Sequence, residues 1–138
     1  MILVDINIFE DVIRKRKGWI KSSGVLVKVR KKEINGYVSA LTPPIIYFLR
    51  IRDKFTDAGA REKMDKITQG FEIIPLTAGI LQKAKNDANF NDFEDAIQFH
   101  SAMEKELNTI ITRNKKDFGN VQNQIKIMDP EEFIEIEK

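Results

Sequence analysis

The residues best suited to chemistry are carboxylates placed after short apolar runs or at the start of a helix. Asp5 directly follows the first apolar run of the chain, and Asp117 lies just beyond a later one. Asp92 and Asp95 stand three residues apart, so they share one face in the first turn of a predicted helix. Because ligands of open parallel sheets bind beyond the carboxyl ends of the strands, we expect Asp5, Asp95 and Asp117 to converge there.

A group of carboxylates at one place indicates a bound cation, because like charges at close range are otherwise unfavourable. Oxygen ligands of this kind suit Mg²⁺ or Mn²⁺ and not zinc. Such a cation activates water and neutralises charge at a phosphoryl group, so these residues suggest metal-dependent chemistry on a phosphodiester. Asn7, Thr112 and Asn114 are polar neighbours at the same predicted strand ends.

Each of these acids also has a structural interpretation. Asp5 could cap the helix that the apolar spacing after it predicts, and this role is compatible with a role in the site. Asp92 could cap the helix that starts near it, with Asp95 as its reciprocal partner in a capping box. Both interpretations stay open on the sequence alone.

The counts of cysteine and histidine exclude several other kinds of site. The chain has no cysteine, which excludes disulfides, Cys-based zinc sites and thiol nucleophiles. With one histidine, it has neither the pair of a two-histidine ribonuclease nor a three-histidine zinc site. His100 falls on an apolar helix face, which favours a core or rim role, and Trp19 is interpreted as a packing residue. No G-x-S-x-G motif presents a serine nucleophile.

The charges are unevenly distributed, although the net charge is only +2. Between Asp11 and Gly36 nine basic residues stand beside two acids, whereas five acids and one base follow from Asp129 onward. The basic region could meet phosphates, or its lysines could be solvated helix faces, and both interpretations remain open.

Short apolar runs alternate with helical periodicity along the whole chain. The predicted strands occupy residues 1–4, 37–40, 71–74, 109–112 and 125–128. This alternation predicts an α/β fold with a parallel sheet covered on both faces. We expect one domain spanning residues 1–138.

Single residues predict several boundaries between these elements. Gly18 should break the first helix, and Gly36 should cap the end of the second. Thr42 should cap a helix that has Pro43 at its first position. Residues 115–123 are expected to form a loop, the best candidate for a mobile segment.

The chain has no recognisable membrane or secretion signal. No apolar run approaches the ~20 residues of a membrane helix. The first residues include an acid and lack the basic region of a signal peptide. We therefore expect a cytoplasmic protein without a membrane partner.

Four segments stand in order along the chain: VDINIF at 4–9, SALT at 39–42, DFEDAIQFHSA at 92–102 and TRNKKDF at 112–118. Together they resemble the PIN domain family, in particular the branch with DFEDA and TRN-x-KDF motifs, and the resemblance covers essentially the whole chain. It implies a Rossmann-like three-layer α/β/α sandwich around a mostly parallel sheet of about five strands. It also implies a Mg²⁺- or Mn²⁺-dependent single-strand ribonuclease. Many such proteins are VapC-type toxins, usually dimeric and neutralised by a small antitoxin.

The resemblance also implies roles for individual residues. Asp5 and Asp95 match the first and third family acids, the usual metal ligands, and Asp117 matches an acid of the last motif. The supporting polar positions are Asn7, Ser39, Asp92, Thr112 and Asn114. The basic residues expected to contact RNA are Arg14, Lys15, Arg16, Arg113, Lys115 and Lys116.

One position departs from the family pattern. An acid usually stands three residues after the threonine of SALT, but this chain has Ile45 there. A site without this acid should hold the metal less tightly, unless Asp92 compensates from a neighbouring turn. The main alternative is therefore a degenerate PIN domain that binds RNA or a protein partner without cleavage. A phospho-accepting receiver-like domain is disfavoured, because Asp5 has no acid adjacent to it.

Overall fold

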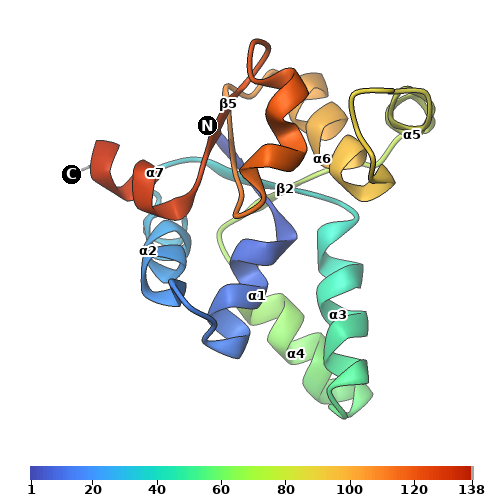
Figure 1. Cartoon of the computed structure of the whole chain (residues 1–138). Coiled ribbons are helices and arrows are strands. Elements are labelled where there is room, and N and C mark those ends of the chain that lie inside the picture. Colours follow the sequence, from blue (N-terminus) through green and yellow to red (C-terminus); the bar gives the residue numbers. More distant parts are fainter. Residues whose placement is uncertain (138) are drawn as a thin grey trace.

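The computed structural model describes residues 1–137, and its centre is a five-stranded sheet (Figure 1). The strands are β1 (Ile2–Val4), β2 (Gly36–Ser39), β3 (Glu72–Ile74), β4 (Thr109–Ile111) and β5 (Lys126–Met128). They lie in the order β3-β2-β1-β4-β5, and every neighbouring pair is parallel. The predicted α/β fold with a parallel sheet is confirmed, and each observed strand overlaps a predicted one.

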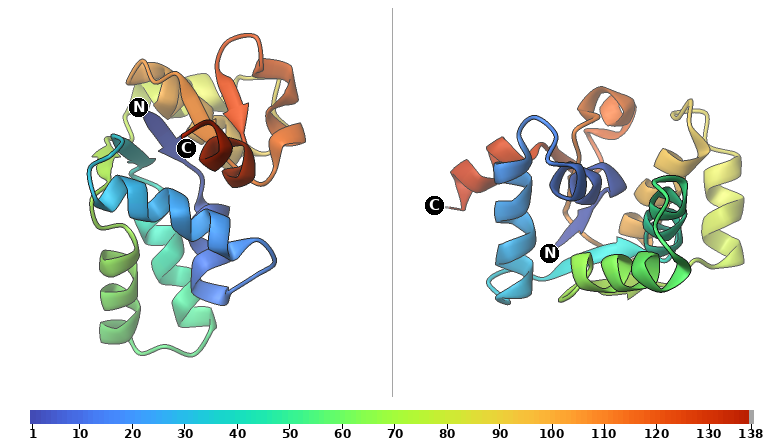
Figure 2. Two further views of the ribbon diagram at one scale, coloured as in Figure 1. Left: turned by 90° about the vertical axis from the view of Figure 1, so that its left-hand side faces the viewer. Right: turned by 90° about the horizontal axis from the view of Figure 1, so that it is seen from below.

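Helices cover both faces of this sheet (Figure 2). One layer contains α1 (Ile6–Arg14), α2 (Trp19–Arg30) and α7 (Pro130–Ile136). The other contains α5 (Ala78–Lys85), α6 (Phe93–Glu104) and the 3-10 helix η1 (Lys115–Val121). The helices α3 (Thr42–Arg52) and α4 (Asp57–Ile67) pack against each other and extend beyond the sheet (Figure 1). Over residues 1–137, none of the helices is both long and apolar enough to cross a membrane.

The alternation of side chains along β1 explains the two layers. Ile2 and Val4 belong to the apolar cluster that contains Phe9, whereas Leu3 belongs to the opposite cluster that contains Phe99. All three strand residues are buried, as expected for a parallel strand covered on both faces. The end of β1 is therefore held firmly by the core.

The strand register brings polar strand ends together. Val4 pairs with Ile111 across β1 and β4, so Asp5 and Thr112 follow the two strands side by side. The backbone N–H of Asp5 donates to the carbonyl of Ile111 at 3.0 Å, which continues the pairing by one residue. The carboxyl edge of the sheet thus positions the polar residues that follow β1 and β4.

The second helix is shorter than predicted. α2 ends at Arg30, and Gly36 does not cap it but begins β2. A Cβ atom at position 36 would lie 2.6 Å from both Cγ atoms of Val29, so only glycine fits where β2 passes close to α2. The glycine is therefore required by packing, and the prediction of a helix cap was wrong.

Two further predictions of local structure were wrong. Thr42 does not cap α3, because Leu41 holds the cap position. The buried Thr42 hydroxyl instead accepts a hydrogen bond from Gln98 Nε2 at 3.3 Å, which joins α3 to α6. Residues 115–121 form η1 where a loop was predicted, because Phe118 turns inward and is fully buried in the core.

Candidate active site

Asp5 stands at the junction of β1 and α1 and has partners on both sides. Its Oδ1 accepts a hydrogen bond from the backbone N–H of Ile6 at 2.8 Å, which makes Asp5 the cap of α1. Its Oδ2 accepts from Thr112 Oγ1 at 2.8 Å and from Asn7 Nδ2 at 3.3 Å. The cap role and the strand-end position therefore coexist, and they hold a buried carboxylate in a fixed place.

The predicted supporting residues Asn7, Thr112 and Asn114 surround this carboxylate. Thr112 Oγ1 accepts from the backbone N–H of Asn114 at 3.1 Å. Asn7 Oδ1 accepts from the backbone N–H of Arg113 at 3.2 Å. These bonds join the start of α1 to the chain that leaves β4, so the two halves of the predicted site are brought together.

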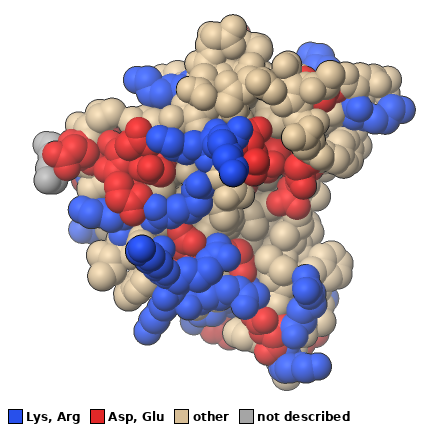
Figure 3. Space-filling view, viewed as in Figure 1, with Lys and Arg blue, Asp and Glu red and all other residues tan. Residues whose placement is uncertain are grey.

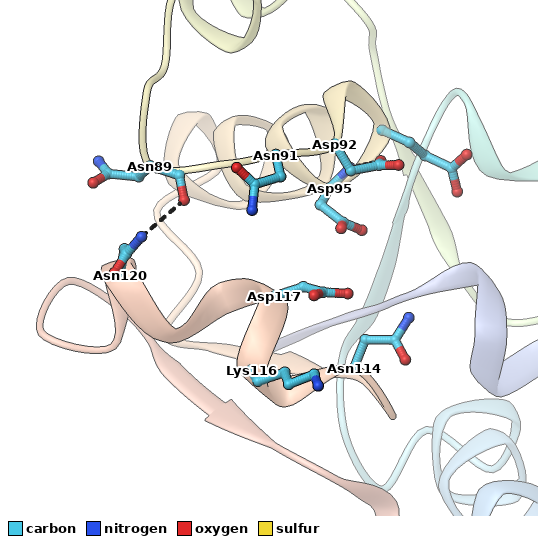
Figure 4. A pocket seen from close by; sticks show the side chains of 9 residues that line it. Asn89, Asn91, Asp92, Asp95, Asn114, Lys116, Asp117 and Asn120 are labelled. Carbon is cyan, nitrogen blue, oxygen red and sulfur yellow. Dashed lines mark hydrogen bonds between the residues drawn. The ribbon is translucent and has the colours of Figure 1, made fainter.

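Asp92 caps α6 by accepting a hydrogen bond from the backbone N–H of Asp95 at 3.0 Å. The reciprocal half of the predicted capping box is not formed, since no residue of 1–137 donates a hydrogen bond to the Asp95 carboxylate. Asp95 instead points toward Asp117 (Figure 4). The structural interpretation therefore explains Asp92 and leaves Asp95 available for chemistry.

Two adjoining cavities contain the predicted acids, and we call them together the acidic cleft. The larger has a volume of about 290 Å³ and is lined by Asn89, Asn91, Asp92, Glu94, Asp95, Asn114, Lys116, Asp117 and Asn120 (Figure 4). The smaller has a volume of about 160 Å³ and is lined by Asp5, Ile6, Asn7, Glu10, Arg16, Glu94, Asp95 and Asn114. Glu94, Asp95 and Asn114 line both cavities. These three residues connect Asp5 with Asp117 in one cleft.

Burial and mutual repulsion raise the pKa of several carboxyl groups in the cleft. Burial is the main cause of the raised pKa of Asp5, and the charges of Asp92 and Asp117 add to it. Burial, followed by the charges of Asp5, Asp92, Asp117 and Glu94, raises the pKa of Asp95 to about 7. The pKa of Glu94 is also raised, first by burial and then by Asp5 and Asp92. A place where several anions oppose one another is one that a cation would stabilise.

The oxygen ligands of the cleft are of the type that a hard divalent cation prefers, although they are not already arranged around a metal position. The available ligands are carboxylate and amide oxygens, which Mg²⁺ and Mn²⁺ prefer. Within residues 1–137, no group of three or more Asp, Glu or His side chains is arranged to hold a metal ion. Asp5 is fixed by its hydrogen bonds, whereas the Asp95 carboxylate has none, so Asp95 is the side chain able to turn toward a cation beside Asp5.

Glu94 is one of the cleft residues that the sequence did not indicate, together with Glu10, Asn89, Asn91 and Asn120. It is half-buried and lines both cavities together with Asp95. The sequence pattern that could have indicated Glu94 is its position between Asp92 and Asp95 in the first turn of a capped helix. Ile45 is half-buried in α3 and lines neither cavity. An additional carboxylate therefore enters the cleft from α6, while the position that lacks an acid lies on α3.

Two other residues singled out from the sequence lie outside the cleft. Ser39 at the end of β2 is buried, and its Oγ accepts from the backbone N–H of Leu41 at 3.1 Å. His100 is half-buried, and its Nε2 lies 2.7 Å from Asp87 Oδ2. His100 is thus a satisfied rim residue, as predicted, and Ser39 supports the backbone after β2.

Most of the predicted RNA-binding cations are paired with acids of the protein itself. The pairs are Arg14 with Glu10 and Asp53, Arg16 with Asp11, Arg113 with Asp11 and Glu131, and Lys115 with Asp129 and Glu132. Lys15 lies over the ring of Trp19, with its Nζ 5.8 Å from the ring centroid. Lys116 lines the larger cavity and forms no ion pair within the described chain. Of the six, Lys116 thus presents an unpaired charge directly to the acidic cleft.

A family model of the PIN domain matches residues 1–116, which is most of the chain. The chain belongs to the PIN domain family. No match was found among curated protein sequences.

Several solved structures share the fold of this PIN domain. A toxin–antitoxin complex from Klebsiella pneumoniae matches with a TM-score of 0.69 at 19% identity, covering 94% of this chain and 98% of that chain. VapBC2 from Rickettsia felis, bound to a DNA fragment from its promoter, matches with a TM-score of 0.69 at 18% identity and the same coverage. FitAcB from Neisseria gonorrhoeae has a TM-score of 0.61 at 21% identity, again with 94% and 98% coverage. At these identities the likeness concerns the fold alone.

Proposed function

We propose that this PIN domain is a Mg²⁺- or Mn²⁺-dependent ribonuclease that cleaves single-stranded RNA. The observation that carries the proposal is the meeting of Asp5, Asp95 and Asp117 in one cleft, contributed by three separate segments of the chain. Membership of the PIN domain family supports the same reaction class. The absence of cysteine and the placement of the single histidine outside the cleft leave no competing nucleophile of those types.

Asp5 and Asp95 are the residues that would hold the metal ion. A bound Mg²⁺ or Mn²⁺ would supply water activation and charge neutralisation at the scissile phosphate. Asp5 is positioned by Thr112 and by the start of α1, whereas Asp95 has the freedom to complete the site. Asp117, which lines the larger cavity, would accept a proton or orient water.

Lys116 and the amide side chains at the rim of the cleft would orient the RNA strand. Lys116 offers an ammonium group to a phosphate beside the carboxylates. Asn89, Asn91 and Asn120 line the same cavity and offer amide donors and acceptors. These neutral and basic groups surround the acids, so the strand would approach the cleft over its rim.

We further propose that the protein is the toxin of a toxin–antitoxin pair, acting as a homodimer and inhibited by a small protein partner. The support is that solved structures of this fold include a toxin–antitoxin complex, which matches over nearly its whole length. Copurification of the chain with the product of its neighbouring gene, and sedimentation of the chain alone, would test the two parts separately.

The deciding experiment is cleavage of a mixed single-stranded RNA in the presence of Mn²⁺, Mg²⁺ or EDTA. Wild type should cleave with either metal and lose activity in EDTA, and Asp95→Asn should be inactive in all three. Asp65→Asn is the matched control, because it removes the same charge from an exposed position on α4 outside the acidic cleft. Cleavage that survives Asp95→Asn would contradict the proposed site.

The alternative is a degenerate PIN domain that binds RNA or a protein without cleavage. Two observations favour it: the apolar Ile45, and the absence of a preformed group of three metal ligands within residues 1–137. Well-folded protein that binds RNA but cleaves with neither metal would establish this alternative.

A further inference from the structure

The turn between α1 and α2 carries a second pocket whose charge is opposite to that of the acidic cleft. It has a volume of about 540 Å³ and is lined by seven consecutive residues, Lys15, Arg16, Lys17, Gly18, Trp19, Ile20 and Lys21. Four of them are cations and none is an acid. We call this site the basic–aromatic pocket. In Figure 3 Lys and Arg side chains gather over this turn, on the same face that shows the acids of the cleft.

The turn is shaped and fixed by bonds to the frame of the cleft. Lys15 and Gly18 adopt left-handed backbone conformations, with φ of 51° and 85°. Arg113 Nη2 donates to the carbonyl of Gly18 at 2.8 Å, and Arg16 Nη2 donates to the carbonyl of Asn7 at 3.0 Å. The pocket is therefore held in a constant position relative to the acidic cleft.

The lysines of the pocket carry charges that the protein itself does not neutralise. Lys17 and Lys21 are exposed and form no ion pair with any residue of 1–137. Lys15 is exposed as well and lies beside the half-buried ring of Trp19. The other predicted RNA contacts at this end of α1 are different, since Arg14 and Arg16 are bonded to Glu10 and Asp11. The pocket thus combines an accessible aromatic ring with free cations.

The pocket and the cleft share one lining residue. Arg16 lines the basic–aromatic pocket and also the smaller cavity that contains Asp5 and Asp95. A strand that occupies the cleft and leaves it past Arg16 therefore arrives at Trp19 and the free lysines.

We propose that the basic–aromatic pocket binds single-stranded RNA beside the cleavage position, with one base stacked on Trp19 and the adjoining phosphates at Lys15, Lys17 and Lys21. This inference rests on the proposed function, because it names the path of that substrate. Aromatic stacking combined with cations along the backbone is how proteins hold single strands without reading their sequence. An acidic protein segment would match the lysines, but it would not use the indole face, and the neighbouring acidic cleft would repel it.

Trp19 is the only tryptophan of the chain, so intrinsic fluorescence reports on this pocket directly. Oligouridylate is titrated into the wild-type protein in EDTA, which prevents metal-dependent cleavage. We expect quenching of Trp19 that saturates together with binding measured by anisotropy of a labelled strand. An abasic strand of equal length should bind more weakly and should not quench, because it has charge but no base to stack.

Two sets of variants separate stacking from charge. Trp19→Ala should raise the Kd roughly 5- to 150-fold, the effect of losing one stacked base, while Trp19→Phe should retain most of the affinity. Lys17→Ala/Lys21→Ala should reduce the slope of log Kd against log salt by about 1.4, since two phosphate contacts are lost. The matched control is Arg30→Ala/Lys31→Ala, two exposed cations without ion pairs in the described chain at the other end of α2, ~18 Å away. This control should leave both quantities unchanged.

The outcomes distinguish this inference from the proposed ribonuclease. Quenching of the wild-type protein, together with a higher anisotropy Kd in Trp19→Ala and in Lys17→Ala/Lys21→Ala, supports the pocket even where no cleavage is found, and the protein is then the degenerate PIN domain. Metal-dependent cleavage without quenching, and with the same Kd for Lys17→Ala/Lys21→Ala as for Arg30→Ala/Lys31→Ala, would overturn RNA binding at this pocket. The proposed ribonuclease activity would then stand without it. Equal quenching by polyglutamate would assign the pocket to an acidic protein segment instead. If circular dichroism shows that Trp19→Ala does not fold, the quenching of wild type and the salt dependence of Lys17→Ala/Lys21→Ala decide.

Discussion

At the scale of single residues, the acidic cleft makes folding sensitive to pH. The pKa of Asp95 is raised from 3.8 to about 7 by burial and by the neighbouring carboxylates. A carboxyl group with a raised pKa binds its proton more tightly in the folded state than in the unfolded state. The stabilisation that comes from proton binding by Asp95 is therefore fully present below a pH of 3.8 and is lost as the pH rises through about 7.

Asp95→Asn should consequently stabilise the protein at high pH and have little effect at low pH. At a pH of about 8 we expect a gain of about 1 kcal/mol in the free energy of unfolding, after allowance for the solvent screening of a half-exposed group. Urea unfolding at this pH and again below the unperturbed pKa would measure the difference. Asp65→Asn should show no gain at either pH. An equal gain from Asp95→Asn at both values would show that the charge of Asp95 is not its source.

A buried ion pair between α1 and α3 gives a second prediction. Arg50 is fully buried and donates from Nη1 to Glu10 Oε2 at 2.8 Å, with a second bond to the other carboxylate oxygen. Arg50→Met would leave the buried Glu10 carboxylate without this partner and should reduce the free energy of unfolding by about 3–5 kcal/mol. Glu10→Gln/Arg50→Met should recover part of the loss, because no unpaired charge remains buried.

Arg14→Met is the matched control for this pair. Arg14 bonds the same Glu10 carboxylate but is partly exposed, so its loss should reduce stability by only about 0–1 kcal/mol. Urea unfolding of the three variants at neutral pH would measure both effects. If Arg50→Met proved no more destabilising than Arg14→Met, burial would not be what gives the ion pair its importance.

Individual residues differ in how well the sequence predicts their surroundings. Asp5 and Asp95 could be placed at one site because a strand end and a helix start are local patterns. Arg113 was expected at the RNA, but its side chain bonds Asp11, Gly18 and Glu131. The first two partners stand 102 and 95 residues away in the sequence. Only the folded chain brings such partners together, so no local pattern could indicate them.

At the scale of elements, the alternation of apolar runs and amphipathic segments was sufficient to predict the five strands and their parallel arrangement. The errors arose where another element determines the local structure. Position 36 needs a glycine because Val29 of α2 lies close to it. The hydroxyl of Thr42 points inward and accepts a hydrogen bond from Gln98. Burial of Phe118 turns the stretch after β4 into η1. In each case a tertiary contact overrides the local signal that suggested a cap or a loop.

The last helix, α7, offers a prediction about one such element. Asp129 Oδ1 accepts from the backbone N–H of Glu132 at 2.8 Å, and Glu132 Oε1 accepts from the backbone N–H of Asp129 at 3.0 Å, which forms a capping box. Asp129→Ala should reduce the free energy of unfolding by about 1 kcal/mol, whereas Asp129→Asn should retain most of it. Thermal or urea unfolding would measure both variants.

The variant Asp129→Ala also tests whether the acidic cleft depends on α7. Glu131 and Glu132 of α7 bond Arg113 and Lys115, which lie in the segment after β4. Because neither glutamate lines the acidic cleft, we expect the cleavage rate of Asp129→Ala to equal that of wild type below its unfolding temperature. A large fall in rate with the fold intact would show that α7 positions Asp117.

At the scale of the whole molecule, charge is nearly balanced but strongly separated. The chain has 23 basic and 21 acidic residues, yet the acidic cleft and the basic–aromatic pocket lie on one face (Figure 3). An RNA strand on this face would be attracted by the pocket and repelled by the cleft. Without a bound cation the two effects oppose each other, so binding should be weak and strongly salt-dependent.

A divalent cation should therefore strengthen RNA binding by this protein, although Mg²⁺ ordinarily weakens protein–RNA binding by competing for phosphates. We expect the Kd of wild type for a strand with a non-hydrolysable linkage to fall as Mg²⁺ is added at constant ionic strength. In Asp5→Asn/Asp95→Asn the cleft has lost the two proposed ligands and part of its repulsion, so the Kd should start somewhat lower and then rise with Mg²⁺. Anisotropy of a labelled strand would measure both curves. A rise in Kd for wild type as well would mean that the cleft does not recruit the metal, and RNA would then be held through the basic–aromatic pocket alone.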